Sequence, residues 1–368
     1  KVFVTVNSTP TAAINAANLA VTGDEISFDG SGSSDPDSDG LSYTWDFGDG
    51  QGGQSGANVS HSYAQGGTYT VQLTVDDNKG TECSKNTTTT TVTINTPPTA
   101  AIKAVNVACA GGGVTFDGSG SSDADGDVLT YTWDFGDGTE KQSGPNVTHV
   151  YAQGGTYTVS LVVDDNKGTN SSSDVATTSI TINTPPSAVF DNVSLACTGD
   201  EVSFDASGSS DADGDPLSYT WDFGDGSSGA SGAQVSHVYA QGGSYSVKLS
   251  IDDNKGTVCS SDQAGTNVRI NTPPVADAGP NHVCCLDAVS DFDGSGSSDA
   301  DGDTLSYAWD FGDGNTGEGA KVTHVYSKPG IYTVTLTVND NSGTRCDSAS
   351  DSFTAIVNAK PTSIIKVR

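Results

Sequence analysis

The sequence predicts an all-β protein built from four tandem, immunoglobulin-like β-sandwiches, with an extra β-strand at each terminus. Three observations predict this architecture. The octapeptide YTWDFGDG recurs, once as YAWDFGDG, so that the tryptophans at positions 45, 133, 221 and 309 lie 88 residues apart. The apolar residues fall in short alternating runs, and 45 glycines together with many Ser, Thr, Asn and Asp residues separate these runs. Alternation is typical of half-buried strands, and a repeat of domain size indicates tandem domains.

Each repeat runs between linkers that resemble N-T-P-P and passes through the same series of motifs. These motifs are F-D-G-S-G-S-S-D, the WDFGDG turn, V-x-H-x-Y and G-x-Y-x-V. The strand that begins at G-x-Y-x-V places Tyr69, Val71, Leu73 and Val75 on one face, with polar residues between them. About seven such strands per repeat are what a two-sheet sandwich requires. The predicted boundaries are an N-terminal strand at 1–7, domains at 8–95, 96–183, 184–271 and 272–358, and a C-terminal strand at 359–368.

The WDFGDG motif is interpreted as a strand that ends in a tight turn. Trp45 and Phe47 alternate with Asp46 and therefore enter the core, while the Asp side chains cap backbone N–H groups of the turn. A phosphate-binding glycine loop is rejected, because Asp49 would repel the phosphate and no helix follows. The histidines of V-x-H-x-Y are expected to be packed or hydrogen-bonded rather than to bind a ligand: His61, His149, His237 and His324.

The charge balance narrows the possible partners. The chain has 46 acidic and 15 basic residues, which gives a formal net charge of −31. Nucleic acid is excluded as a partner because its phosphates would be repelled by such a field. Membrane insertion is also excluded, since the apolar runs are too short to form a spanning helix.

Taken together, the four recurring motifs resemble the PKD domain family, over nearly the whole chain from about residue 8 to 358. This resemblance implies an immunoglobulin-like sandwich found in extracellular and cell-surface proteins. There such domains act as adhesive, spacer or load-bearing modules and not as catalysts. In microbial secreted enzymes they are accessory parts.

An acidic cluster in each repeat is a candidate metal site. Three carboxylates on alternate positions repel one another, and a hard divalent cation such as Ca²⁺ would offset this repulsion. The alternative is a solvated, Asp-rich turn. The clusters are Asp35, Asp37 and Asp39; Asp123, Asp125 and Asp127; Asp211, Asp213 and Asp215; and Asp299, Asp301 and Asp303.

Two further positions join these clusters. One is the Asp that ends the long alternating strand on its inward parity, namely Asp77, Asp165, Asp253 or Asp340. The other is the linker Asn, which lies 28 residues before the first Asp of each cluster: Asn7, Asn95, Asn183 or Asn271. The resemblance to PKD-like domains of secreted collagenases implies that calcium is held near this linker. The prediction is about one Ca²⁺ per repeat, with Asp39 and its equivalents outside the first ligand sphere.

The seven cysteines indicate an oxidising compartment. Cys197 with Cys259 is the preferred disulfide in the third repeat, and Cys346 is expected to pair with Cys285 or the adjacent Cys284. Cys83 and Cys109 are left either free or bridging the first two domains. Because seven is odd, at least one thiol is unpaired or pairs between chains.

Sequons give weaker support for a secreted glycoprotein, since they also arise by chance in Ser/Thr-rich chains. The predicted glycosylation sites are Asn7, Asn58, Asn86, Asn146, Asn170 and Asn192.

The termini suggest how copies associate. Residues 1–7 match the last strand of a repeat, and residues 358–367 match the linker and first strand of another. Unpaired apolar strands favour addition to a neighbouring sheet, and a head-to-tail contact that does not close gives a filament. The alternative is that both ends are pieces of a longer repeat protein.

The predicted function is therefore that of a non-catalytic, extracellular structural subunit of a cell-surface filament or stalk, stiffened by calcium and assembling with copies of itself. An enzyme is not expected, because the acidic groups recur identically in four turns without a nucleophile constellation. The alternative is an adhesive region, or an accessory region that binds carbohydrate or protein, within a larger secreted enzyme or adhesin.

Overall fold

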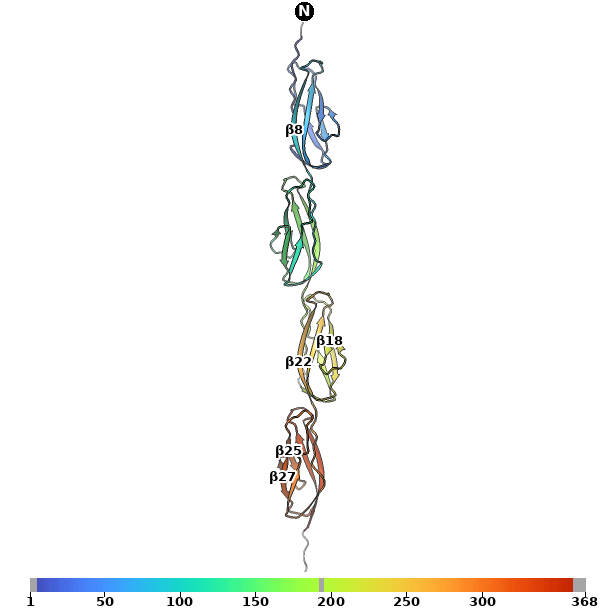
Figure 1. Ribbon diagram of the computed structural model, residues 1–368, viewed down its shortest axis with the longest axis vertical. Coiled ribbons are helices and arrows are strands. Elements are labelled where there is room, and N and C mark those ends of the chain that lie inside the picture. Colours follow the sequence, from blue (N-terminus) through green and yellow to red (C-terminus); the bar gives the residue numbers. More distant parts are fainter. Residues whose placement is uncertain (1–4, 192–194, 360–368) are drawn as a thin grey trace, which may run out of the picture. The chain divides into compact units, whose positions relative to one another are not determined.

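The computed structural model describes residues 5–191 and 195–359, and these residues form β-strands joined by turns and loops (Figure 1). The chain divides into two units, residues 1–183 and 184–368, each of which contains two sandwiches. The all-β fold predicted from the sequence is confirmed. No helix among the described residues is long and apolar enough to cross a membrane.

In the first unit, each sandwich packs a five-stranded sheet against a smaller sheet. The five-stranded sheet of the first repeat has the order β2 (Leu19–Val21), β8 (Lys85–Asn95), β7 (Gly67–Asp76), β4 (Ser42–Asp46), β5 (Gln54–Ser55), and faces β1 (Asn15–Ala16), β3 (Ile26–Asp29), β6 (Asn58–His61). The second repeat has β9 (Val107–Cys109), β15 (Ser173–Asn183), β14 (Gly155–Asp164), β11 (Thr130–Asp134), β12 (Gln142–Ser143), facing β10 (Gly113–Asp117) and β13 (Asn146–Val150).

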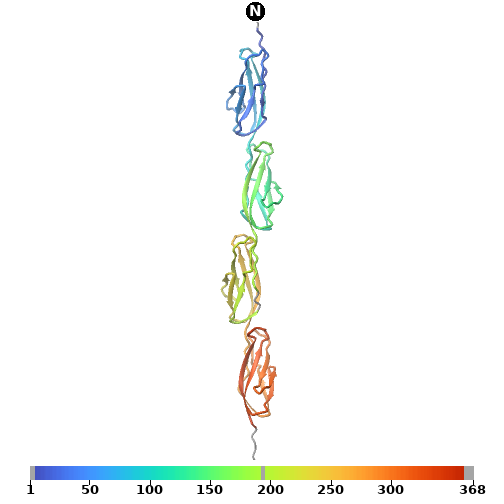
Figure 2. The same cartoon turned by 180° about the vertical axis from the view of Figure 1, so that it is seen from behind.

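The second unit repeats this topology, which Figure 2 shows from the opposite side. The third repeat has β16 (Leu195–Cys197), β22 (Ser261–Asn271), β21 (Gly243–Asp252), β18 (Ser218–Asp222), β19 (Ala230–Ser231), facing β17 (Glu201–Asp205) and β20 (Gln234–Val238). The fourth has β23 (His282–Cys285), β29 (Ser348–Asn358), β28 (Gly330–Asn339), β25 (Ser306–Asp310), β26 (Thr316–Glu318), facing β24 (Val289–Asp293) and β27 (Lys321–Val325).

The cores follow the predicted parity of the strands. Val71, Leu73 and Val75 of β7 are fully buried, whereas the residues between them are not. Trp45 is also fully buried, and its indole N–H donates to the carbonyl of Gly56 at 2.9 Å. Each repeat has a separate hydrophobic core of this kind, so each sandwich carries its own folding free energy.

The turn after Trp45 requires glycine. Gly48 has φ +77°, and a Cβ atom there would lie 2.5 Å from the carbonyl oxygen of Thr70 on the neighbouring strand. Asp46 and Asp49 accept backbone N–H groups from Gly48 and Gln51, as the sequence predicts. The motif is therefore a structural turn.

The second aspartate of the turn also contacts a strand that follows it, through a half-buried histidine. His61 Nε2 lies 2.7 Å from Asp49 Oδ2, and its ring stacks on Phe47 with a centroid distance of 4.1 Å. The same pairing recurs in the other repeats as His149 with Asp137, His237 with Asp225 and His324 with Asp313. The prediction that these histidines are packed and hydrogen-bonded is confirmed.

These pairs predict a loss of stability in acid. Burial tends to raise the pKa of Asp225, but hydrogen bonds from Ser227 and His237 lower it to about 2 from its ordinary 3.8. A carboxyl group with a lowered folded-state pKa stabilises the fold above about pH 4 and loses this contribution as the pH falls towards about 2. This loss should appear when urea unfolding is measured at a series of pH values between 6 and 2, with hydrogen exchange used to report on the third repeat. Asp225→Asn should flatten the pH dependence there, and an unchanged profile would contradict the assignment.

The predicted terminal strands fall mostly outside the described residues. Of 1–7, the structure describes residues 5–7, which are in no strand, and of 359–368 it describes residue 359. Strand exchange by these segments therefore stays a prediction. The fourth repeat has its own last strand, β29, which pairs along its whole length with β28.

Candidate metal centre at the linker of each repeat

In the first, second and fourth repeats, the predicted ligands come from three segments that meet at one end of the sandwich. The acidic cluster lies in the loop between β3 and β4, and Asp77 directly follows β7. Pairing of Ser42 in β4 with Asp76 in β7 brings that loop beside Asp77. The linker is the third segment, and it contacts Asp77 because Asn7 Nδ2 donates to Asp77 Oδ2 at 2.7 Å. The same contact joins Asn95 to Asp165 at 2.7 Å and Asn271 to Asp340 at 2.9 Å.

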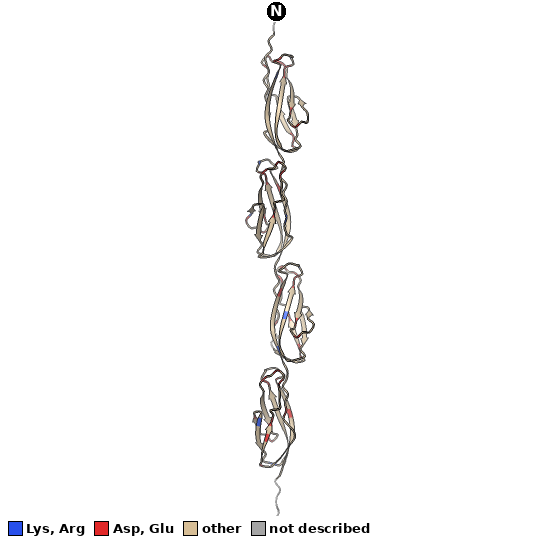
Figure 3. Cartoon of the chain, viewed as in Figure 1, with Lys and Arg blue, Asp and Glu red and all other residues tan. Residues whose placement is uncertain are grey.

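Three carboxylates of each cluster converge. In every repeat one ligand oxygen from each of the three aspartates lies within 4.8 Å of the others. Figure 3 marks the acidic residues of all four repeats in red. This arrangement can hold a metal ion, and the hydrogen bonds of each carboxylate indicate what role it has.

The first aspartate offers an oxygen that has no protein partner. Asp35 Oδ1 accepts the backbone N–H groups of Asp37 and Asp39, at 2.8 and 3.3 Å. Asp35 Oδ2 is buried and lacks a hydrogen-bond partner, and the same holds for Oδ2 of Asp123, Asp211 and Asp299. A buried, unpartnered carboxylate oxygen is unfavourable unless a cation satisfies it, and here it recurs at the same position in each repeat. The residues present therefore fit a metal ion.

The second aspartate holds the linker. Asp125 Oδ2 accepts the backbone N–H of Thr96 at 2.6 Å, and its Oδ1 accepts the Thr96 hydroxyl at 3.1 Å. Thr184 binds Asp213 and Thr272 binds Asp301 in the same way, whereas Ser8 donates only its backbone N–H to Asp37. The linker and the acidic loop are thus one hydrogen-bonded structure.

The third aspartate pairs with a cationic side chain that is not among the predicted site residues. Lys79 Nζ lies 2.8 Å from Asp39 Oδ1, and the hydrogen bond and charge of Asp39 raise the pKa of Lys79. Lys167 and Lys255 repeat this pair, with Asp127 and Asp215. In the fourth repeat Ser342 replaces the lysine, and Arg269 from the preceding strand β22 binds Asp303 instead. The recurring D-D-N-K-G motif could have revealed the lysine, since it follows Asp77 by two residues.

The strand-end aspartate is buried in every repeat. Asp77, Asp165, Asp253 and Asp340 are each at most 3% exposed. Burial tends to raise the pKa of Asp77, but hydrogen bonds from the Asn7 amide and the Lys79 backbone N–H lower it overall. The side-chain N–H₂ of Asn271 likewise donates to Asp340, which leaves the side-chain oxygen Oδ1 of Asn271 buried without a partner. This oxygen is a second atom available to a cation.

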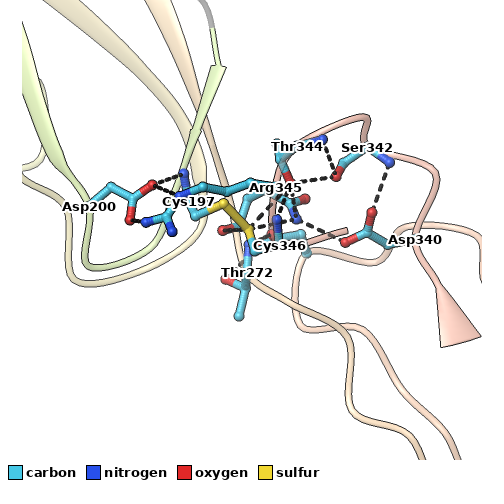
Figure 4. Close-up of a disulfide and its surroundings, with 10 residues drawn as sticks. Cys197, Asp200, Thr272, Asp340, Ser342, Thr344, Arg345 and Cys346 are labelled. Atoms are coloured by element: carbon cyan, nitrogen blue, oxygen red, sulfur yellow. Dashed lines mark hydrogen bonds and ion pairs between the residues drawn. A yellow bond between two sulfur atoms is a disulfide. The ribbon is translucent and has the colours of Figure 1, made fainter. Parts of the chain in front are cut away.

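The disulfide expected within the third repeat is wrong. Cys197 pairs with Cys346 of the fourth repeat, with 6.2 Å between their Cα atoms (Figure 4). Cys197 ends β16 next to Asn271, whereas Cys259 precedes the other end of β22, which has 11 residues. At about 3.3 Å per residue that strand separates them by roughly 30 Å, far beyond the reach of a disulfide.

The remaining cysteine predictions are corrected in the same way. Cys346 bonds neither Cys285 nor Cys284, and both of these are free, as is Cys83. Cys109 and Cys259 are each disulfide-bonded, so a Cys83–Cys109 bridge between the first two domains is also wrong. The odd cysteine count does leave unpaired thiols, as expected.

The sequons differ in accessibility. The amide nitrogens of Asn7 and Asn86 are engaged by Asp77 and by the carbonyl of Pro10, so a glycan there would have to break these contacts. Asn58, Asn146 and Asn170 are exposed, and Asn192 lies outside the described residues. Glycosylation at the exposed sites stays a prediction.

The fold and the sites together define a class: tandem immunoglobulin-like sandwiches whose linkers are tied into acidic clusters. A family model described as "PKD domain" matches residues 7–92, 95–181, 183–268 and 271–355. The chain belongs to the PKD domain family.

Known proteins with similar sequences carry this domain within longer chains. "Collagenase ColA" of Clostridium perfringens is 44% identical over 78 residues, which are 21% of this chain and 7% of the collagenase. "Dyslexia-associated protein KIAA0319" of Homo sapiens is 29% identical over 417 aligned positions, which cover 98% of this chain and 37% of that protein. The solved "PKD1 domain of Vibrio anguillarum Epp" is 40% identical and covers 25% of this chain and 100% of that domain, with a TM-score of 0.21.

Proposed function

We propose that the chain is a non-catalytic, extracellular structural protein: a repeat subunit of a cell-surface filament or stalk that binds calcium and assembles head to tail. This proposal rests on how the linker site is assembled from residues of two successive repeats. Asn95 ends the last strand of the first repeat, yet its side chain binds Asp165 of the second repeat. An ion held there would therefore restrict the hinge between neighbouring sandwiches.

Calcium is the cation that fits best. The available donors are carboxylate and amide oxygens, which are the hard ligands that Ca²⁺ prefers in flexible sets of six to eight. Mg²⁺ demands a small octahedral cage and keeps several waters, which a site with a linker and two loops matches less well. Asp35, Asp37, Asp77 and the Asn7 side-chain oxygen would be the ligands in the first repeat, with the equivalent residues elsewhere.

An extracellular location is supported by the disulfides. Disulfide bonds persist in oxidising compartments, and Cys197, Cys346, Cys109 and Cys259 are all disulfide-bonded. The charge of −31 and the absence of catalytic constellations in the repeated motifs agree with a structural role.

Head-to-tail assembly would use the linker contacts that recur from repeat to repeat. Asn7 makes the same contact to Asp77 that Asn95, at the end of β8, makes to Asp165. Asn358 ends β29 in register with Cys285, just as Asn95 ends β8 in register with Val21. A contact of this kind between two copies would propagate without closing. Addition of strands 1–7 and 359–368 to the neighbouring sandwich is the proposed mode of contact.

Assembly can be measured by sedimentation velocity and electron microscopy of the 368-residue chain with Ca²⁺. The proposal expects species whose mass grows with concentration, and fibres one sandwich wide. Deletion of residues 359–368 should abolish growth while leaving the four repeats folded. A full-length chain that stays monomeric at high concentration, with calcium bound, would exclude the filament.

The alternative is an accessory binding region within a larger secreted protein, which the 44% identity to a stretch of a collagenase favours. Pull-down of collagen or glycans by the intact chain would identify such a role. Saturable capture that persists when assembly is blocked would favour the alternative, whereas the structural proposal expects none.

A further inference from the structure

The disulfide Cys197–Cys346 locks the junction between the third and fourth repeats. Cys197 ends β16, where it pairs in register with Asn271, the last residue of the third repeat's last strand. Cys346 lies in the loop between β28 and β29, with its Sγ 3.6 Å from Asn271 Nδ2 and 3.3 Å from Thr344 Oγ1. Figure 4 shows the bond beside the ion pair of Asp200 and Arg345. The lock thus joins a cysteine at the end of a strand in one repeat to a cysteine in a loop of the next repeat.

The first repeat carries the loop half of such a lock without a partner. Cys83 Sγ lies 3.9 Å from Asn7 Nδ2 and 3.3 Å from Thr81 Oγ1, the surroundings that Cys346 has in the fourth repeat. Its thiol is free and partly exposed. Cys83 therefore occupies the bonding position of Cys346, at the end of the first repeat where the linker arrives.

The fourth repeat carries the strand half. Cys285 pairs in register with Asn358, as Cys197 does with Asn271. The residue after each cysteine donates its backbone N–H to that Asn, Leu286 at 3.0 Å and Thr198 at 2.8 Å. Cys285 is free and exposed, at the end of the fourth repeat where the chain leaves.

The adjacent Cys284 has a different role. It packs against the core of the fourth repeat, in the place that Ala196 takes in the third. Only Cys285 therefore has the position of a bonding cysteine, which makes Cys284 a matched control.

We propose that Cys285 of one copy and Cys83 of a second copy form an intermolecular disulfide that locks head-to-tail assembly covalently. The inference rests on the proposed filament and adds a specific bond to it. The two free halves complement each other: one is a strand cysteine of the fourth repeat and the other is a loop cysteine of the first repeat. Two such halves are bonded where the third repeat meets the fourth.

The bond forms by thiol–disulfide exchange with a small-molecule disulfide such as oxidised glutathione. One cysteine thiolate attacks this disulfide and releases one small thiol. The second cysteine thiolate then attacks the mixed disulfide, forms the S–S bond between the copies and releases the other small thiol. The two cysteines lose two protons and two electrons, and the oxidant is reduced to two thiols.

The intermolecular junction differs from the internal one at two points. Ala288 and Glu82 stand where Asp200 and Arg345 form their ion pair, so this pair is absent between copies. At the internal junctions, a glycine leaves room for the second aspartate of the next repeat: a Cβ at Gly66 would lie 1.8 Å from Asp125 Oδ1, and one at Gly242 would lie 1.9 Å from Asp301 Oδ1. In the fourth repeat, Pro329 occupies the position of these glycines. The Asp37 carboxylate must therefore turn aside, and Pro329→Gly should raise the yield of the cross-link.

The test uses the full chain in a glutathione redox buffer, with non-reducing electrophoresis and peptide mass spectrometry. The wild type should give a ladder of covalent oligomers that contains the Cys83–Cys285 peptide pair. Cys83→Ser and Cys285→Ser alone should each lose all bands above the monomer. A mixture of these two variants should give covalent dimers and nothing larger, and Cys284→Ser should keep the full ladder.

Each other outcome counts against the bond. A ladder that survives Cys83→Ser, Cys83 recovered with another cysteine, or both thiols recovered only as glutathione adducts would overturn it. Electron microscopy under reducing conditions separates the two proposals. Filaments that form there but never acquire the cross-link would refute the covalent lock alone, whereas a chain that never associates would refute both.

Discussion

Saturating Ca²⁺ should raise the unfolding temperature of the repeats by roughly 10–20 °C over the chelated protein. The buried Oδ2 atoms of Asp35, Asp123, Asp211 and Asp299 have no partner, and a cation would satisfy all four. A ligand at 100 times its Kd stabilises the folded state by about 2.7 kcal/mol per site. In a domain of this size 1 kcal/mol corresponds to about 4–8 °C. Differential scanning calorimetry with Ca²⁺ and with EGTA measures the shift.

A single isosteric change tests which residues are responsible. Asp35→Asn should remove the calcium-dependent shift from the first repeat only and leave the other three shifted. Asp24→Asn is the matched control, because Asp24 is an exposed acid of the same repeat outside the cluster. Equal shifts in both variants, or unfolding that is indifferent to EGTA in the wild type, would contradict the site.

Trp133→Ala should unfold the second repeat selectively. Trp133 is fully buried, its indole N–H donates to the carbonyl of Gly144 at 2.9 Å, and it packs in a core separate from those of the other repeats. Truncating a buried tryptophan to alanine costs about 3–5 kcal/mol, which is a large part of the stability of a small domain. Hydrogen exchange with mass spectrometry, read on peptides of β11 and β14, should show faster exchange there than in the wild type.

The control for this change is Val128→Ala, since Val128 is 83% exposed. Its effect should stay within about 0.5 kcal/mol. Should Trp133→Ala loosen all four repeats equally, the sandwiches would not be energetically separate.

Much of the fold could be predicted because the repeat displays its own alternation four times. The strand that contains Val71, Leu73 and Val75 shows a period of two, and WDFGDG marks a turn that has room only for glycine at Gly48. Local patterns of this kind depend on neighbouring residues in the sequence, which is why they can be read without a structure.

The metal site was predictable in its acids and in the linker Asn, because each recurs at a constant offset. The separate role of each aspartate could not be predicted, since it depends on contacts between segments that are far apart in the sequence. Asp125 binds the linker, Asp127 binds Lys167, and the Oδ2 of Asp123 is left without a partner. Nothing in the spacing of three similar aspartates distinguishes these roles.

The disulfide pairing could not be predicted because it follows the junction between repeats and not the repeat itself. Cys197 and Cys259 lie in one predicted domain, which favoured their pairing in the sequence. The parallel pairing of β16 with β22 places Cys197 at the far end of the sandwich, next to the fourth repeat. Parallel register is a long-range property, and the cysteine positions alone leave it open.

The most direct test of the account is the number of calcium ions that the chain binds and where they bind. Isothermal titration calorimetry of the wild type should give close to four ions per chain, and Asp35→Asn should give close to three. No saturable uptake, or a stoichiometry that Asp35→Asn leaves unchanged, would contradict the claim that each linker is a calcium site.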